Sequence, residues 1–184
     1  MRWLRPSPLA AGASVRSVKR LAPLLLVLLV ACSSSGATTQ GGAAVKAIDG
    51  AFPELSGQTL DGGSFSPADY RGRVVVVNFW ATWCGPCRKE QPILSAVERA
   101  QGGDGAVFIG VNYRDDAAAA RAYAKEFAIP YPSLSDASGS LAYRFGVPYL
   151  PSTIIADADG RLRYRIVGAI DQQTLNGLLS KVST

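Results

Sequence analysis

Two cysteines three positions apart are the most chemically reactive side chains of this sequence. Cys84 and Cys87 enclose Gly85 and Pro86, and Trp83 precedes them. A thiolate attacks a disulfide through a mixed-disulfide intermediate, and a second thiol one helical turn away can then resolve that intermediate. The spacing therefore predicts thiol–disulfide exchange, with Cys84 as the nucleophile and Cys87 as the resolving thiol.

The same pair could instead form a structural disulfide or half of a metal site. The chain of 184 residues has three cysteines and no histidine. A four-ligand zinc site needs two more cysteines or histidines, and none remain once Cys32 is assigned to the leader. The lack of histidine also excludes Ser-His-Asp and Cys-His catalysis, because both need an imidazole base. We therefore expect no metal and no cofactor apart from a redox-active Cys84–Cys87 disulfide.

The elements around the cysteines are predicted to place them at the start of a helix. Residues 74–79 form an unalternated, mostly β-branched run, which is typical of a strand buried on both faces. Residues 85–100 have apolar side chains at helical spacing, with an expected kink at Pro92. At such a junction, unpaired N–H groups and the helix dipole stabilise a thiolate at Cys84. Pro86 lacks an N–H, but the first helical turn has no intrahelical acceptor for one.

The remaining sequence alternates predicted strands and helices. Before the cysteines, we predict a β-hairpin over 52–65, with turns at 56–58 and 61–63, and one helical turn over 66–70. After them, we predict a buried strand over 107–111, an alanine-rich helix over 116–127 capped by Asp115 or Asp116, and a short helix over 138–145 closed by Gly146. The chain then continues with strands over 152–156 and 161–167, joined by a turn at 157–160, and ends with an amphipathic helix from Asp171. Strands joined by a helix make a βαβ unit, so we predict an α/β fold.

The N-terminal region has the composition of an export signal. Five of the nineteen Lys and Arg residues precede residue 21, whereas all fourteen Asp and Glu residues follow it. An apolar run over 21–31 covers only about half of a ~30 Å hydrocarbon core, which is too short for a stable transmembrane helix. Without this leader the charges balance, so the pI of about 9.3 does not predict a nucleic-acid partner.

The end of the apolar run, Leu29-Val30-Ala31-Cys32, resembles a bacterial lipobox, in which the cysteine is lipidated and becomes the mature N-terminus. The alternative is an incidental cysteine in an ordinary signal peptide. Residues 33–44 are small, polar and aperiodic, as expected of a flexible tether. We predict a lipoprotein signal peptide over 1–31, a tether over 32–47 and one folded domain over 48–184. Cys32 would anchor this domain to the outer face of the bacterial cytoplasmic membrane.

The segment Trp83-Cys84-Gly85-Pro86-Cys87 after a buried strand resembles the thioredoxin active site. Residues 78–83, Glu90 and residues 145–153 are similar to the TlpA/ResA-like branch of membrane-attached thioredoxins. The resemblance extends over roughly 49–182. It implies a thioredoxin-like fold, with a central mixed β-sheet flanked by helices and an N-terminal β-hairpin extension.

The resemblance also implies roles for residues outside the cysteine pair. Glu90 would exchange the proton of the resolving thiol, the alternative being a solvated helix acid. Asn78 stands where thioredoxin itself has an acid, and an amide cannot shuttle a proton, which favours Glu90. Pro151 matches the family's cis-proline, with Pro148 as the alternative. A cis bond there would expose the backbone of Leu150 to an extended substrate segment beside the cysteines.

In function, the resemblance implies a reductase of exported proteins that contain cysteine pairs, such as apocytochrome c before haem attachment. An integral membrane thiol carrier would supply the electrons. Two alternatives remain, a disulfide-forming oxidase and a non-catalytic lipoprotein that uses the fold for binding. Reduction potentials range from about −270 mV in thioredoxin to about −120 mV in DsbA. The pair Gly85-Pro86 matches thioredoxin and favours reduction, and Trp83 is expected to flank the site.

Overall fold

The computed structural model describes residues 42–101, 103 and 105–183. The predicted signal peptide, Cys32 and the predicted tether up to residue 41 lie outside these residues. In the part of the chain that is described, no helix has the length and apolar character needed to cross a membrane.

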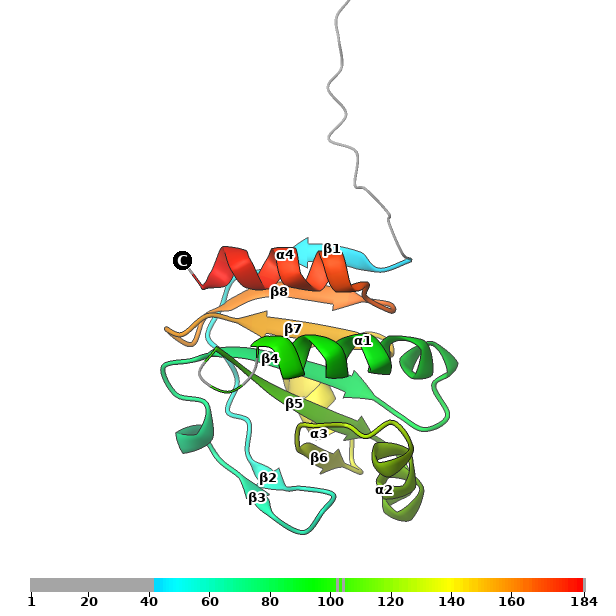
Figure 1. Ribbon diagram of the computed structural model, residues 1–184. Helices are drawn as coiled ribbons and strands as arrows, with labels where there is room; N and C mark the ends of the chain where they lie inside the picture. Colours follow the sequence, from blue (N-terminus) through cyan, green and yellow to red (C-terminus); the bar gives the residue numbers. More distant parts are fainter. Residues whose placement is uncertain (1–41, 102, 104, 184) are drawn as a thin grey trace, which may run out of the picture. The chain divides into compact units, whose positions relative to one another are not determined.

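Six strands form a central mixed sheet in the spatial order β1-β8-β7-β4-β5-β6 (Figure 1). Strands β4, β5 and β6 run parallel, β7 is antiparallel to β4, and β8 is antiparallel to both β7 and β1. The strands are β1 (Ala44–Ala47), β4 (Val74–Trp80), β5 (Ala106–Tyr113), β6 (Ser133–Asp136), β7 (Ser152–Ala156) and β8 (Leu162–Val167). The predicted central mixed sheet is confirmed.

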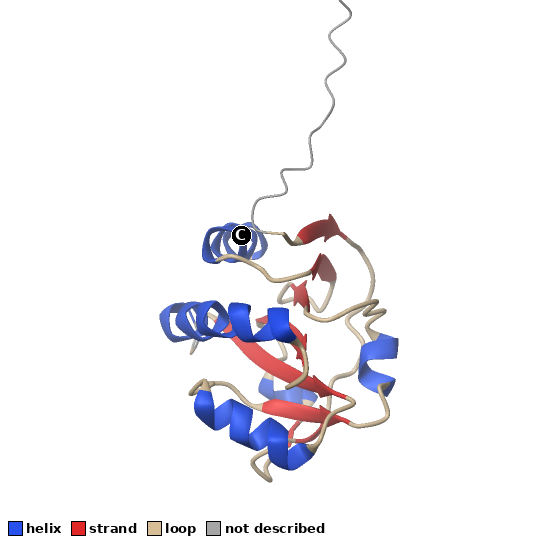
Figure 2. Cartoon of the chain, turned by 90° about the vertical axis from the view of Figure 1, so that its right-hand side faces the viewer, coloured by secondary structure: helices blue, strands red, loops and turns tan. Residues whose placement is uncertain are grey.

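Helices cover both faces of this sheet (Figure 2). They are the single turn η1 (Pro67–Asp69) and the helices α1 (Gly85–Gln101), α2 (Ala117–Glu126), α3 (Ser140–Arg144) and α4 (Gln172–Val182). Along β4, Val74 and Val76 belong to the same apolar cluster as α1 and α4, whereas Val75 and Val77 belong to the cluster that contains α3. Burial on both faces explains why this strand carries an unalternated β-branched run.

The elements around the site agree with the sequence-based prediction. The βαβ unit β4-α1-β5 is present, with β4 and β5 paired in parallel. Asp116, and not Asp115, caps α2, because its side chain accepts the Ala119 N–H at 2.8 Å. Asp171 caps α4 through the Thr174 N–H, also at 2.8 Å. Both caps satisfy N–H groups that a helix start leaves unpaired.

Two strands were missed by the sequence analysis. Residues 44–47, predicted as the end of the tether, form strand β1, in which Ala44 pairs with Val167 and Ala47 with Tyr164. The predicted boundary between tether and domain at residue 48 is therefore wrong. Strand β6 is short and polar in sequence, and pairs in parallel with β5 at the edge of the sheet. Neither segment shows an apolar pattern, so its extended conformation depends on pairing with a neighbour.

The predicted N-terminal hairpin is present but smaller than expected. Strands β2 (Gly57–Gln58) and β3 (Ser64–Phe65) contain two residues each and pair antiparallel. The turn predicted at 56–58 is wrong, because Gly57 and Gln58 pair with Phe65 and Ser64. The turn predicted at 61–63 is confirmed. This hairpin lies against β6, with Thr59 bridged to Leu134, and Leu60 in its turn belongs to the apolar cluster that contains both cysteines.

Candidate functional site

A disulfide joins Cys84 and Cys87 beyond the carboxyl end of β4. The two Cα atoms are 5.3 Å apart, and Cys84 lies directly before the first residue of α1. Cys84 is 5% exposed and Cys87 is 1% exposed. The less buried sulfur-bearing residue is therefore the one at the helix start, where an incoming sulfur atom can approach it.

The sulfur of Cys84 occupies the place of a helix-capping acceptor. The backbone N–H of Cys87, at the third position of α1, donates to Cys84 Sγ at 3.2 Å. Pro86 at the second position has no N–H to donate. A side-chain acceptor at this position normally takes the N–H of the second or third helical residue. Negative charge on Cys84 Sγ would receive this hydrogen bond and the favourable field of the helix N-terminus, which is the condition for a reactive thiolate.

The loop before Cys84 is held by the segment that connects β5 to α2. The backbone N–H and the hydroxyl of Thr82 both donate to Asp115, at 2.6 and 2.8 Å. The indole N–H of Trp83 donates to the carbonyl of Arg114 at 3.4 Å. Trp83 is 60% exposed, so it forms part of the surface beside the disulfide.

Sequence reasoning missed the contribution of Asp115 and Arg114 to this loop. Asp115 was considered only as a helix cap, a role that Asp116 fills. A signal was present, because residues that follow the carboxyl ends of adjacent parallel strands meet at the same edge of a sheet. Asp115 follows β5, and Thr82 follows its neighbour β4.

Glu90 is buried one turn after Cys87 on α1. It is 1% exposed, and its carboxylate accepts hydrogen bonds from Asn78 Nδ2 at 2.7 Å and from the Ile170 N–H at 3.1 Å. Burial raises the pKa of Glu90 to about 7, although both hydrogen bonds oppose the rise. The alternative of a solvated helix acid is therefore wrong. A carboxyl group with this pKa can both hold and release a proton near neutral pH.

Asn78 links Glu90 to the strand that follows Pro151. Its amide Nδ2 donates to Glu90 and also to Thr153 Oγ1 at 3.3 Å. Thr153 is the register partner of Asn78 on β7. The position where thioredoxin itself has an acid is thus occupied here by a neutral donor to Glu90.

Pro151 directly precedes β7, whose first residue pairs with Phe79 near the end of β4. The bond between Leu150 and Pro151 is cis. Among the described residues, the cis bond thus precedes Pro151 and not Pro148, as predicted. Leu150 is partly buried and packs against the apolar cluster that contains both cysteines. The Leu150–Pro151 segment therefore lies on the same side of the sheet edge as the disulfide.

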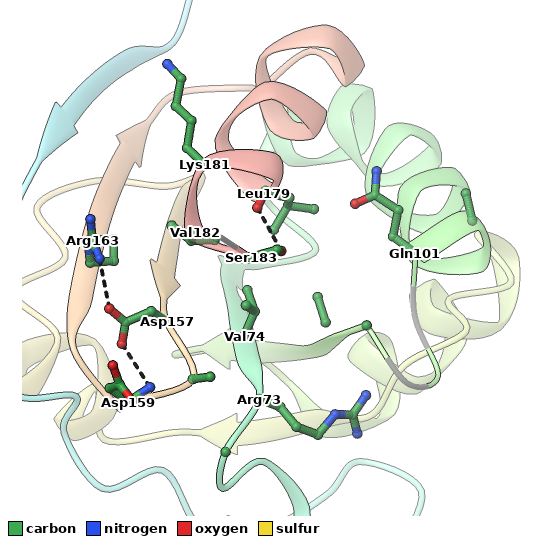
Figure 3. Close-up of a pocket in the computed structure, with 15 residues that line it drawn as sticks. Arg73, Val74, Gln101, Asp157, Asp159, Arg163, Leu179, Lys181, Val182 and Ser183 are labelled. Atoms are coloured by element: carbon green, nitrogen blue, oxygen red, sulfur yellow. Dashed lines mark hydrogen bonds and ion pairs between the residues drawn. The ribbon is translucent and has the colours of Figure 1, made fainter.

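An apolar cavity of about 350 Å³ lies beside the disulfide. Trp83 and Leu150 contribute to its wall, and the other lining residues are Tyr113, Ala142, Val147, Pro148 and Tyr149. A larger cavity of about 880 Å³ lies at the opposite end of the sheet, lined by Val74 at the start of β4 and by Val182 at the end of α4 (Figure 3). Asp157 and Arg163 form an ion pair at the edge of that cavity. Because it is a full strand length from Cys84, the larger cavity has no part in the exchange chemistry.

In the described part of the chain, no cluster of three or more His, Cys, Asp or Glu side chains is arranged to hold a metal ion. Of the three cysteines, Cys84 and Cys87 form the disulfide, and Glu90 lies one helical turn after Cys87.

Comparison with known proteins agrees with this geometry. The Redoxin family model matches residues 47–180. The chain belongs to the redoxin family. A thiol:disulfide interchange protein DsbE from Pseudomonas fluorescens biotype C is 40% identical over 123 residues, which cover 66% of this chain and 67% of that protein. A thiol-disulfide oxidoreductase ResA from Bacillus thuringiensis subsp. konkukian is 27% identical over 168 residues, covering 89% of this chain and 97% of that protein.

Solved structures of redoxin relatives have the same fold. A secreted disulfide oxidoreductase of Mycobacterium tuberculosis, described as homologous to E. coli DsbE, superposes with a TM-score of 0.63 at 30% identity. The superposition covers 69% of this chain and 95% of that protein. With a buried strand, a helix-start cysteine pair and these relatives, the chain is a thiol-disulfide oxidoreductase of thioredoxin-like fold.

Proposed function

We propose that this redoxin reduces disulfides of exported proteins outside the cytoplasmic membrane. The observation that carries the exchange chemistry, in either direction, is the helix-capped Cys84 sulfur together with the buried Glu90 carboxyl group one turn past Cys87, whose pKa is raised by burial. The reducing direction is supported by the pair Gly85-Pro86, which matches thioredoxin, and by the resemblance to the TlpA/ResA-like branch.

The proposed reaction moves two electrons and two protons to the client. In the reduced protein, the Cys84 thiolate attacks one sulfur of the client disulfide, and the first client thiolate leaves and takes a proton from solvent. Cys87 passes its proton to the Glu90 carboxylate and attacks Cys84 Sγ. The second client thiolate leaves with the proton that Glu90 returns. The protein is left with the Cys84–Cys87 disulfide, which a thiol donor must reduce before the next cycle.

The client would bind along the surface beside the disulfide. The backbone at Leu150, before the cis bond, would pair with an extended client segment, as in other modes of strand addition. Trp83 and the apolar cavity next to it provide space for a client side chain. We propose apocytochrome c, with its paired cysteines, as one client, because the TlpA/ResA-like resemblance implies it.

The proposed anchor at Cys32 precedes strand β1, through which the chain enters the described domain. Ala44, the first residue of β1, pairs with Val167 at the same end of the sheet as the carboxyl end of β4 (Figure 1). Gly168 next to it donates its N–H to the carbonyl of Pro151 at 2.9 Å. Three strand spacings separate β1 from β4, which is about 15 Å. A lipid at Cys32 would tether this domain to the membrane that holds the proposed integral thiol donor.

A disulfide-forming oxidase is the second candidate. One observation favours it, since the hydrogen bond from the Cys87 N–H to Cys84 Sγ would stabilise the thiolate of the reduced form. Stabilising the reduced form raises the potential and makes a protein of this fold more oxidising. A binding role without catalysis is disfavoured, because both cysteines and the cis-proline are intact.

The equilibrium potential of the Cys84–Cys87 couple distinguishes the two directions. We would titrate the chain of residues 33–184 against glutathione and dithiothreitol buffers. A value at or below about −250 mV supports the reductase, and one above about −150 mV contradicts it and supports the oxidase. Insulin reduction checks the chemistry itself: Cys84→Ser abolishes turnover, whereas Cys87→Ser accumulates a mixed disulfide with the client. Unchanged turnover of Cys84→Ser would contradict the enzymatic assignment.

A further inference from the structure

Asp115 is a carboxylate near the disulfide that the exchange reaction does not use. Its two oxygens accept four hydrogen bonds, from the Thr82 N–H at 2.6 Å, the Thr82 hydroxyl at 2.8 Å, Asn112 Nδ2 at 2.9 Å and the Asp116 N–H at 3.0 Å. Capping of α2 does not require it, because Asp116 performs that role. Asp115 therefore accepts hydrogen bonds from both the N–H and the hydroxyl of Thr82, which lies two positions before Cys84.

The loop that carries Asp115 is itself fixed to the sheet. Asn112 is 1% exposed and is the register partner of Trp80, the last residue of β4. Arg114 has a left-handed backbone with φ of 45°, a conformation that a non-glycine residue adopts only at an energetic cost. Its N–H donates to the Asp136 carbonyl at 3.1 Å and its guanidinium to the Ser138 carbonyl at 3.3 Å. Asp115 is thus attached to a rigid support on one side and to the active-site loop on the other.

We propose that Asp115 is a positioning residue for Cys84, acting through Thr82. This inference rests on the proposed role of Cys84 as nucleophile. The hydrogen bonds of Asp115 to Thr82 keep residues 81–84 in the conformation in which Cys84 Sγ caps α1.

The effect is expected in the reduced protein. When the disulfide is closed, the S–S bond holds Cys84 against Cys87. Once it opens, Cys84 Sγ stays within reach of the Cys87 N–H only if the loop before it keeps its place. The loop is joined to Cys84 by the hydrogen bond from the Cys84 N–H to the Ala81 carbonyl at 3.1 Å. After the S–S bond is broken, the hydrogen bonds between Asp115 and Thr82 still hold the loop. The Cys84 thiolate therefore stays at the N-terminus of α1 without a further rearrangement.

Substitution of Asp115 itself would mix two opposite effects. Loss of its hydrogen bonds would loosen the loop and weaken the thiolate, whereas loss of its negative charge would favour a thiolate nearby. Thr82 separates them, because Thr82→Val removes only the hydroxyl donor and leaves the charge of Asp115 and the backbone N–H in place. Thr82→Ser keeps the hydroxyl and serves as the matched control.

The experiment measures the alkylation rate of Cys84 by iodoacetamide between pH 4 and pH 9. It uses the chain of residues 32–184 with Cys32→Ser and Cys87→Ser, so that one thiol remains. In Thr82→Val we expect alkylation at pH 7 to be about three- to tenfold slower, because a hydrogen bond to a charged group is lost. The pH midpoint of the reaction moves upward. Thr82→Ser stays within about twofold of the parent at every pH.

Thermal unfolding and the potential of the couple complete the test. A Thr82→Val protein that unfolds at a lower temperature but alkylates with the parent rate and midpoint would show that the Asp115 contact is only structural, and would overturn the proposal. If the contact acts as proposed, the Cys84–Cys87 couple has a more negative reduction potential in Thr82→Val than in Thr82→Ser, because the thiolate of the reduced form is less stabilised. Where the valine variant fails to fold, Thr82→Ala provides the same comparison. Failure of the proposed function is seen separately, in Cys84→Ser insulin turnover, and does not depend on Thr82.

Discussion

Two carboxyl groups near the disulfide, those of Glu90 and Asp115, have pKa values that are shifted in opposite directions. Glu90, on α1, is almost completely buried and accepts two hydrogen bonds, and burial raises its pKa to about 7. Asp115, after β5, is partly exposed and accepts four hydrogen bonds. Burial acts to raise the pKa of Asp115 too, but the bonds from Thr82, Asn112 and Asp116 outweigh it and hold the pKa below its ordinary value of 3.8.

The difference shows how one fold assigns different tasks to chemically similar groups. Desolvation penalises the charged form, and each donated hydrogen bond favours it, so the balance between burial and donors sets the pKa. Glu90 has high burial and few donors, which suits a proton carrier for Cys87. Asp115 has many donors and low burial, which suits a permanent negative acceptor. The comparison can be tested, because the contribution of Glu90 to the stability of the fold should fall as the pH rises, whereas that of Asp115 should fall as the pH is lowered.

The largest expected effect is on the stability of Glu90→Gln. The folded pKa of Glu90 lies above its ordinary value of 4.5, so its contribution to stability is fully present below pH 4.5 and is lost as the pH rises through about 7. A rise of this size corresponds to about 3 kcal/mol at about 1.4 kcal/mol per pKa unit. We expect Glu90→Gln and the parent to unfold at similar urea concentrations at pH 4, and the variant to be more stable by about this amount at pH 8.5.

The neighbouring amide makes this substitution acceptable in the folded state. Asn78 Oδ1 has no hydrogen-bond partner in the described structure, so Asn78 can turn its amide to accept from the new Gln side chain. Glu98→Gln, two turns further along α1, is the matched control for replacing a carboxylate by an amide on this helix. A constant difference between Glu90→Gln and the parent from pH 4 to pH 8.5 would contradict the raised pKa.

The same substitution tests the role of Glu90 in turnover. With no carboxyl group to accept the proton of Cys87, Glu90→Gln should reduce insulin about a hundredfold more slowly at pH 7, the lower end of the range for general acid–base catalysis. The parent rate should show an inflection near pH 7 that the variant lacks, while Glu98→Gln keeps both the rate and the inflection. If Glu90→Gln retains the inflection, another group carries the proton.

The sequence predicted the cysteine pair, the buried strand before it and the helix after it, because each depends on local pattern. Glu90 and the cis bond at Pro151 followed from resemblance to a family. Strand β1 and Asp115 were not recognised, since their positions depend on contacts between distant segments: β1 pairs with β8 more than 100 residues later, and Asp115 reaches Thr82 across 33 positions. Side-chain pairing across adjacent strands is not encoded in a local pattern, whereas periodicity and helix caps are.

The smallest expected effect concerns Asp115, and its sign is opposite to that of Glu90. Because the folded pKa of Asp115 is lowered, its contribution to stability is present above its ordinary value of 3.8 and is lost as the pH falls through the folded pKa. Asp115→Asn should therefore be less stable than the parent at pH 7 by about 1 kcal/mol, a value already reduced for solvent screening of a partly exposed group.

This deficit of Asp115→Asn should shrink as the pH is lowered from 4 to 2, which urea unfolding at a series of pH values would measure. Asp159→Asn, in an exposed turn at the opposite end of β7, is the matched control and should show no comparable deficit at pH 7. A deficit that is unchanged down to pH 2 would mean that Asp115 contributes by shape and not as a charged acceptor. Only the proton-carrying role of Glu90 would then remain from this comparison. The proposal that Asp115 positions Cys84 would depend on the alkylation rates of the Thr82 variants.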